Sequence, residues 1–355
     1  MFPTGSSVPT TSPPTSSPIK ITQRPTYPPR KGVLLEKGTP GFAYIADPNA
    51  LVVNDTLYLF CSTDPPTAKK GSRYSLMREY TLLTTKTLEE DAPWLNHGTV
   101  LRPSMRFPHI SAYTGKLMFA PAAAYAGGWF YLYFPFLRDS EGSSNVGIAR
   151  ARNPTDPQSW ELVVSIIPKL NLFDPAIMVA PDGRVYMYGN SREPGQGPLA
   201  KRMLGGELSQ DMTSFVNSHP KSMSIVYGGF ITEGVFAFWR PLAGMNGGEP
   251  RIIYYLIARI QPNGRDCLYY WMSESPLKQV PASNSGYQLT PNQYDAAPHC
   301  SVAEFKGRYY LFYHSGLENG GNRFRRSSCM DELTFQSDGH INFVRLSCAY
   351  QPTKK

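Results

Sequence analysis

The stretch DPNALVVNDTLYLF (47–60) combines a leading carboxylate, an apolar run, a tight turn and an aromatic strand. Three further stretches repeat this order: APAAAYAGGWFYLYF (120–134), DPAIMVAPDGRVYMY (174–188) and HCSVAEFKGRYYLFY (299–313). A looser fifth copy begins with EGVFAFW (233–239). The leading residues lie 54 to 73 positions apart, and a β-rich unit that recurs at such intervals is typical of a β-propeller.

The repeats predict an all-β, five-bladed β-propeller in a single domain over residues 32–350. The aromatic runs are bounded by Gly, Asn, Asp and Pro, as in paired strands, and no long amphipathic helix is visible. In a propeller the leading strands line one central channel, so the five leading residues should meet at one mouth. They are Asp47, Ala120, Asp174, Glu233 and His299.

Residues 1–31 are rich in Pro, Ser and Thr and hold almost no large apolar side chains, so we predict a disordered tail. No apolar stretch reaches the ~18 residues of a membrane span, and the N-terminus lacks the apolar region of a signal peptide. We therefore expect no membrane partner. The missing signal suggests a cytoplasmic protein.

The net charge of +8 comes from scattered basic residues rather than a stripe, so we expect no nucleic-acid partner. The five cysteines have no CxxC spacing, which disfavours a zinc ribbon. We expect mainly buried thiols, with room for one disulfide in an oxidising compartment.

A ring of carboxylates suits the cleavage of a glycosidic bond. One protonated acid must serve the leaving oxygen and one ionised base must activate water, and a third carboxylate can raise the pKa of the acid. Asp47, Asp174 and Glu233 supply three such groups. Asp47 and Asp174 each precede proline, which should bias both toward an extended backbone. A single Asp-Pro pair would suggest only a turn, but two pairs in matching register favour a shared site.

Several ordered motifs resemble glycoside hydrolase family 43, which comprises five-bladed propeller enzymes acting on arabinose- and xylose-containing polysaccharides. The resemblance covers nearly all of residues 40–345. The matching motifs are ADPN (46–49), FAPA (119–122), FDPA (173–176), TEGVF (232–236), PHCSVAEFKGRYYLFYH (298–314) and RRSSCMDELTF (325–335).

The resemblance implies a role for individual residues. Asp47 matches the general base, Asp174 the residue that raises the pKa of the acid, and Glu233 the general acid. His299 matches a channel histidine that in relatives often binds calcium or an ordered water, and a hydrogen-bonded histidine without metal is the alternative. No cofactor is required, although a structural calcium could occupy the channel.

Substrate contacts are expected from Arg326, Phe119 and Trp94. A structural salt bridge is the alternative for Arg326, and packing in a loop is the alternative for Trp94. Two positions depart from the family pattern, because Ala122 replaces an acidic residue and Cys300 replaces a histidine. Neither departure removes one of the three acids.

The sequence therefore predicts a glycoside hydrolase that inverts configuration and releases terminal β-D-xylosyl or α-L-arabinofuranosyl units from hemicellulose. Such a substrate, a xylo- or arabino-oligosaccharide or polysaccharide, would suggest an extracellular protein. An endo-arabinanase of the same family and a propeller that binds sugar without cleaving it are the alternatives. An interaction propeller of the WD type is disfavoured because its Gly-His and Trp-Asp signatures are missing.

Overall fold

The computed structural model describes the chain between residues 32 and 348, and the following statements refer to that part. Within this range it leaves out 70–76, 90–91, 111–116, 138–143, 165–166, 168–171, 193–200, 217–223, 228–230, 232, 245–247, 262–264, 282, 285 and 293–298. The predicted tail at 1–31 lies outside the described residues and stays a prediction.

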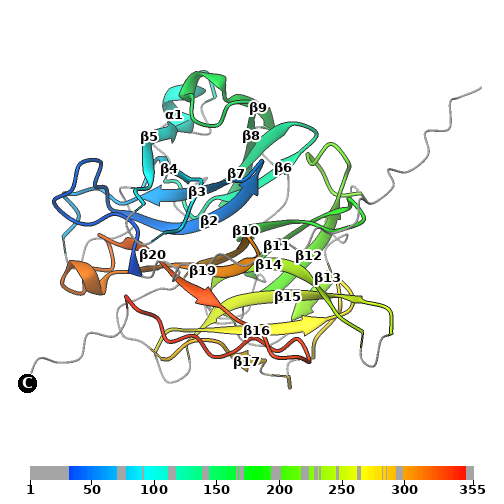
Figure 1. The fold of residues 1–355 in the computed structure, drawn as a ribbon. Coiled ribbons are helices and arrows are strands. Elements are labelled where there is room, and N and C mark those ends of the chain that lie inside the picture. Colours follow the sequence, from blue (N-terminus) through cyan, green and yellow to red (C-terminus); the bar gives the residue numbers. More distant parts are fainter. Residues whose placement is uncertain are drawn as a thin grey trace, which may run out of the picture.

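Five four-stranded antiparallel sheets form the blades of a propeller, which confirms the predicted all-β fold (Figure 1). The strands are, for blade 1, β2 (Ile45–Val53), β3 (Thr56–Thr63), β4 (Tyr80–Thr85) and β5 (Leu95–Leu101); for blade 2, β6 (Ala122–Ala126), β7 (Trp129–Leu137), β8 (Ser144–Ala151) and β9 (Glu161–Val164); for blade 3, β10 (Leu172–Val179), β11 (Val185–Arg192), β12 (Lys201–Leu208) and β13 (Ser224–Tyr227); for blade 4, β14 (Glu233–Leu242), β15 (Arg251–Ile260), β16 (Cys267–Ser273) and β17 (Tyr287–Gln288); for blade 5, β18 (Cys300–Phe305), β19 (Arg308–Ser315), β20 (Ser327–Leu333) and β1 (Gly32–Val33).

The ring of blades is closed by strands from both ends of the described chain. The innermost strands β2, β6, β10, β14 and β18 each contact the next, and β18 returns to β2. The short strand β1 pairs with β20, so the first described residues complete the last blade. A disulfide between Cys329 and Cys348 ties β20 to the segment that follows it, whereas Cys61, Cys267 and Cys300 are buried thiols.

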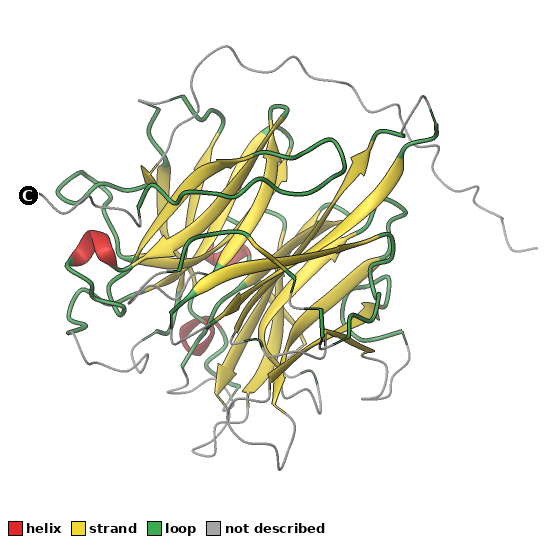
Figure 2. Cartoon of the chain, turned by 90° about the horizontal axis from the view of Figure 1, so that it is seen from below, coloured by secondary structure: helices red, strands yellow, loops and turns green. Residues whose placement is uncertain are grey.

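Helical structure is confined to short connections. Helix α1 (Pro103–Arg106) follows β5, and two 3₁₀ turns, η2 (Pro157–Ser159) and η6 (Leu317–Asn319), lie in loops. Figure 2 shows how strands dominate the described chain. None of the described helices is long and apolar enough to cross a membrane.

Hydrophobic clusters fill the spaces between neighbouring blades rather than one central core. Side chains of blades 1 and 2 form one such cluster around Phe60 and Trp160, and those of blades 4 and 5 form another around Tyr255 and Tyr313. Because both faces of each sheet pack against another blade, the strands carry the apolar and aromatic runs seen in the sequence.

The tight turns between the first two strands of the blades agree with the sequence. Asn54 and Asp55 both have positive φ (47° and 56°) between β2 and β3, as a two-residue hairpin turn requires. Gly127-Gly128, Asp182-Gly183 and Lys306-Gly307 likewise separate paired strands.

The backbone at the two Asp-Pro pairs differs from the expectation. Asp47 and Asp174 have φ values of 51° and 47°, so neither is extended. Each lies at a register shift of its strand, where the ladder skips two residues before pairing resumes. Such bulges re-aim side chains, and Asp is among the residues that tolerate positive φ. The proline following each acid donates no hydrogen bond and therefore suits the interrupted ladder.

Candidate active site

A single cavity of about 160 Å³ collects the residues that lead the five repeats. This confirms the convergence predicted from the repeats. Its described lining consists of Asp47, Met77, Phe119, Ala120, Phe173, Asp174, Glu233, His299 and Arg326.

The bulges at the start of β10 and β14 bring the acids of blades 3 and 4 together. The backbone N–H of Gly234 donates to Oδ2 of Asp174 at 3.1 Å. Gly234 has φ 69°, and a Cβ at this position would lie 3.0 Å from the ring of His299. Glycine therefore lets β14 approach His299 closely, which places Glu233 beside the imidazole.

His299 lies between the three acids. Its Nδ1 is 3.5 Å from Oδ1 of Asp47, and its Nε2 is 3.8 Å from both Oδ2 of Asp174 and Oε1 of Glu233. Burial by itself would lower the pKa of His299, but the charges of Asp174 and Asp47, together with Glu233, raise it to about 9. The imidazole is thus a cation at neutral pH and balances part of the negative charge.

Asp47 is held by a second cation. Nη1 of Arg326 donates to Oδ1 of Asp47 at 2.9 Å, while Nε and Nη2 of Arg326 both donate to the buried carboxylate of Asp64 at 2.8 Å. Burial would raise the pKa of Asp47, but the charges of Arg326 and His299 hold it well below its ordinary value. Asp47 is therefore ionised throughout the working range of most enzymes.

His314 supports the same residue from the second strand of blade 5. The backbone N–H of Asp47 donates to Nδ1 of His314 at 3.0 Å, so the proton of the neutral ring belongs on Nε2. Burial and the nearby Arg326 lower the pKa of His314 to about 4. His314 is fully buried and its Nε2 has no hydrogen-bond partner among the described residues.

Glu233 faces a cation that the sequence reasoning missed. Arg259 on β15 is paired in register with Glu233 and contacts its Oε1. The same guanidinium donates through Nε to Oδ1 of Asp266 at 2.7 Å. Glu233 thus lies among Asp174, His299 and Arg259 and remains partly open to solvent.

The donor atoms of Asp174, Glu233 and His299 lie within 4.8 Å of one another, as a metal site would require. Calcium prefers six to eight oxygen ligands, whereas this group offers two carboxylates and one imidazole nitrogen. Gly234 already occupies one oxygen of Asp174, and Arg259 contacts Glu233. The described side chains thus fit a bridging imidazolium better than a calcium ion.

Two of the three predicted substrate contacts line the cavity, and the third does not. Phe119 lines the cavity beside Phe173, with their ring centroids 5.9 Å apart. Arg326 also lines it, although its guanidinium is engaged by Asp47 and Asp64. Trp94 does not line the cavity: it is 6% exposed and packs edge-on against Phe312 in a core cluster. The sugar-stacking role expected for Trp94 is therefore replaced by packing.

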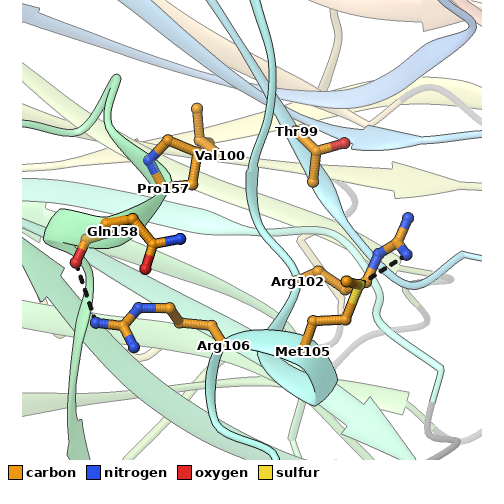
Figure 3. A pocket seen from close by; sticks show the side chains of 7 residues that line it. All are labelled: Thr99, Val100, Arg102, Met105, Arg106, Pro157 and Gln158. Carbon is orange, nitrogen blue, oxygen red and sulfur yellow. Dashed lines mark hydrogen bonds between the residues drawn. The ribbon is translucent and has the colours of Figure 1, made fainter.

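A larger cavity of about 410 Å³ lies at the outer edge between blades 1 and 2 (Figure 3). It is bounded by α1 and η2, and Arg106 donates across it to the carbonyl oxygen of Gln158. No carboxylate is among its described lining residues. The chemistry expected of acids therefore belongs to the smaller cavity on the channel axis.

The sequence model described as "Glycosyl hydrolases family 43" matches residues 42–341. Among curated proteins, the chain is 29% identical to "Xylosidase/arabinosidase 43A" of Humicola insolens, over 84% of this chain and 96% of that protein. It is 26% identical to "Xylosidase/arabinosidase" of Bacteroides ovatus, over 84% and 94%.

Among solved structures, the fold is similar to that of CoXyl43, a β-xylosidase/α-arabinofuranosidase from a compost microbial metagenome, with a TM-score of 0.69. That likeness covers 90% of this chain and 99% of the other at 23% identity, and that structure holds xylotriose in a calcium-free form. The family match covers most of the chain, and the cavity on the channel axis is lined by three acids. This chain is therefore a glycoside hydrolase and belongs to family 43.

Proposed function

We propose that this chain is an inverting exo-acting hydrolase that releases terminal β-D-xylosyl or α-L-arabinofuranosyl units from xylo- or arabino-oligosaccharides and polysaccharides. The names of two relatives, both xylosidase/arabinosidase, support this substrate class. The xylotriose held by CoXyl43 supports it further. We also propose that residues 32–350 act as one catalytic domain.

One observation carries the proposal: Asp47 and Glu233 contact opposite nitrogens of the same imidazole, that of His299. The ring separates the two carboxylates, and Asp47 is not part of the tight group formed by Asp174, Glu233 and His299. An inverting enzyme needs this separation, because a water must fit between the base and the anomeric carbon.

The roles follow from the surroundings of each acid. Asp47, kept ionised, accepts a proton from the water whose oxygen attacks the anomeric carbon. As the bond from that carbon to the leaving oxygen breaks, Glu233 gives its proton to the leaving oxygen. The negative charge of Asp174 beside Glu233 favours the protonated acid, and Oδ2 of Asp174 is fixed by the N–H of Gly234.

The size of the cavity favours exo action. Its volume of about 160 Å³ lies below the ~300–1,000 Å³ of pockets for drug-sized ligands. The half-buried rings of Phe119 and Phe173 wall the site beside the acids. We therefore favour one terminal pentose at the acids over the extended chain that an endo-arabinanase would bind. Three acids around one imidazolium likewise exceed what a sugar-binding propeller without activity needs.

We propose that the reaction requires no metal ion. The support is the donor set already described, in which the imidazolium of His299 does the charge balancing that a channel calcium would otherwise supply. A calcium ion in the channel would have to compete with the proton on His299.

Changing Arg326 should move the acidic limb of the pH–rate profile. In Arg326→Met the burial of Asp47 remains while its main cationic partner is lost, so the pKa of Asp47 should rise by at least ~1 unit. The limb of kcat/KM at low pH should then shift upward. Arg326→Lys keeps the charge and should shift it less, and Arg325→Met provides a neighbouring control. An unchanged limb in Arg326→Met would remove Asp47 from the role of base.

The stereochemistry of the product tests the separation of the acids. Proton NMR of the first sugar released from an aryl β-xyloside should show the α anomer before mutarotation, because a single displacement by water inverts the configuration. A first-formed β anomer would require a covalent intermediate and would exclude Asp47 as a base acting through water.

The leaving group tests Glu233. Glu233→Gln should slow unactivated substrates by ~10²–10⁴-fold, while an activated aryl glycoside should retain relatively more activity because its departure needs less protonation. Asp47→Asn should slow both substrates by similar factors, since water activation is needed in each case. Equal losses for the two substrates in Glu233→Gln would show that another group is the general acid.

A further inference from the structure

Arg259 connects the proposed general acid to a second buried carboxylate. Arg259 is 3% exposed, and it contacts Oε1 of Glu233 with one end of its guanidinium. Its Nε and Nη2 lie 2.7 and 2.5 Å from Oδ1 of Asp266. The contact crosses from β14 to β15 at a paired position, so the strand register itself places Arg259 against Glu233.

Asp266 is also held by a second donor, Gln261. Asp266 is 4% exposed and directly precedes β16. Nε2 of Gln261 donates to Oδ1 of Asp266 at 2.7 Å, the same oxygen that accepts from Arg259. The line from Glu233 through Arg259 to Asp266 therefore runs from β14 across β15 to the residue that directly precedes β16.

This arrangement resolves a conflict in the charge balance of Glu233. A buried arginine beside a carboxyl group favours the ionised form, which works against an acid that must hold its proton. Asp266 lies on the far side of the same guanidinium and offsets part of its positive charge. The contact with Arg259 holds Oε1 of Glu233 in place, and with it the orientation of the carboxyl group.

We propose that Arg259 and Asp266 act as a pair of positioning residues that orient Glu233 and set the pH at which it loses its proton. The proposal rests on the assignment of Glu233 as the general acid. Arg259 fixes the carboxyl group and lowers its proton affinity, and Asp266 restrains that effect. Neither residue is among the described lining of the cavity.

Other groups also face Glu233 and must stay constant in the test. Asp174 of β10 and His299 before β18 both lie on the cavity side. The differences between variants of Arg259 and Asp266 can therefore be assigned to that pair.

The pair predicts shifts of opposite sign. Arg259→Met removes the cation, so the high-pH limb of kcat/KM for an aryl pentoside should move up by ~1 unit, with a loss of ~10²-fold in rate from misorientation. Asp266→Asn leaves the cation uncompensated, so the limb should move down. The double variant Arg259→Met/Asp266→Asn removes both charges and should lie between the single variants. It also avoids leaving Asp266 buried without its partner, so it should fold where Arg259→Met does not.

Arg251→Met is the matched control, because Arg251 lies on the same strand in an exposed pair with Glu274 and should leave the limb unchanged. A ¹³C NMR titration of the Glu233 carboxyl carbon in each variant gives the same comparison without turnover. It therefore separates failure of this proposal from an inactive wild type, which would instead contradict the proposed function. If the pKa of Glu233 shifted in the same direction in both single variants, or did not shift in folded variants, Arg259 and Asp266 would have only a structural role.

Discussion

The contact of one largely enclosed imidazole with three carboxylates is the constraint on which the site depends. Burying ionised groups is costly unless they are paired, and the channel mouth gathers Asp47, Asp174 and Glu233 around His299. Because the pKa of His299 is raised from 6.5 to about 9, its contribution to stability is complete below about pH 6.5 and is lost as the pH rises through 9. Asp47 behaves oppositely: its lowered pKa gives stability at higher pH that is lost under acid conditions.

The propeller supplies the geometry that this charge balance needs. Each blade brings the leading residue of one repeat to the axis, and the contacts between neighbouring inner strands fix their spacing. The supporting cations come from elsewhere in the blades, with Arg326 at the start of blade 5's third strand and Arg259 on the second strand of blade 4. The acids thus lie at the cavity, while the groups that tune them are buried behind it.

The sequence predicted those site residues that lead the repeats. Asp47, Asp174, Glu233 and His299 occupy equivalent positions in four of the five repeats, so their convergence follows from the period alone. The aromatic strands and their turns were predicted for the same reason. The repeats did not predict the backbone conformation of Asp47 and Asp174. The proline that follows each residue favours an extended conformation, whereas the β-bulge at each position imposes a positive φ.

The sequence did not reveal Asp64 and Arg259, because these residues come close to their partners only in the folded chain. Asp64 lies 262 positions from Arg326 and follows a strand without any repeat in register, and nothing in the sequence pairs Arg259 with Glu233 until the strands are aligned. Trp94 was instead assigned a role that it does not have. An aromatic residue in an acidic loop can stack on a sugar or pack against the protein, and Trp94 packs against Phe312. Only the fold decides between such alternatives.

The central claim is that His299 is an imidazolium at neutral pH, and the ring nitrogens of that residue report it directly. ¹⁵N NMR of the histidine side chains, assigned with a His299→Gln variant, should show both nitrogens of His299 protonated at pH 7.5 and a titration near pH 9. Addition of calcium should leave these signals unchanged. A neutral ring at pH 7.5, or a calcium-dependent shift of its nitrogens, would contradict the charge balance on which the proposed mechanism rests.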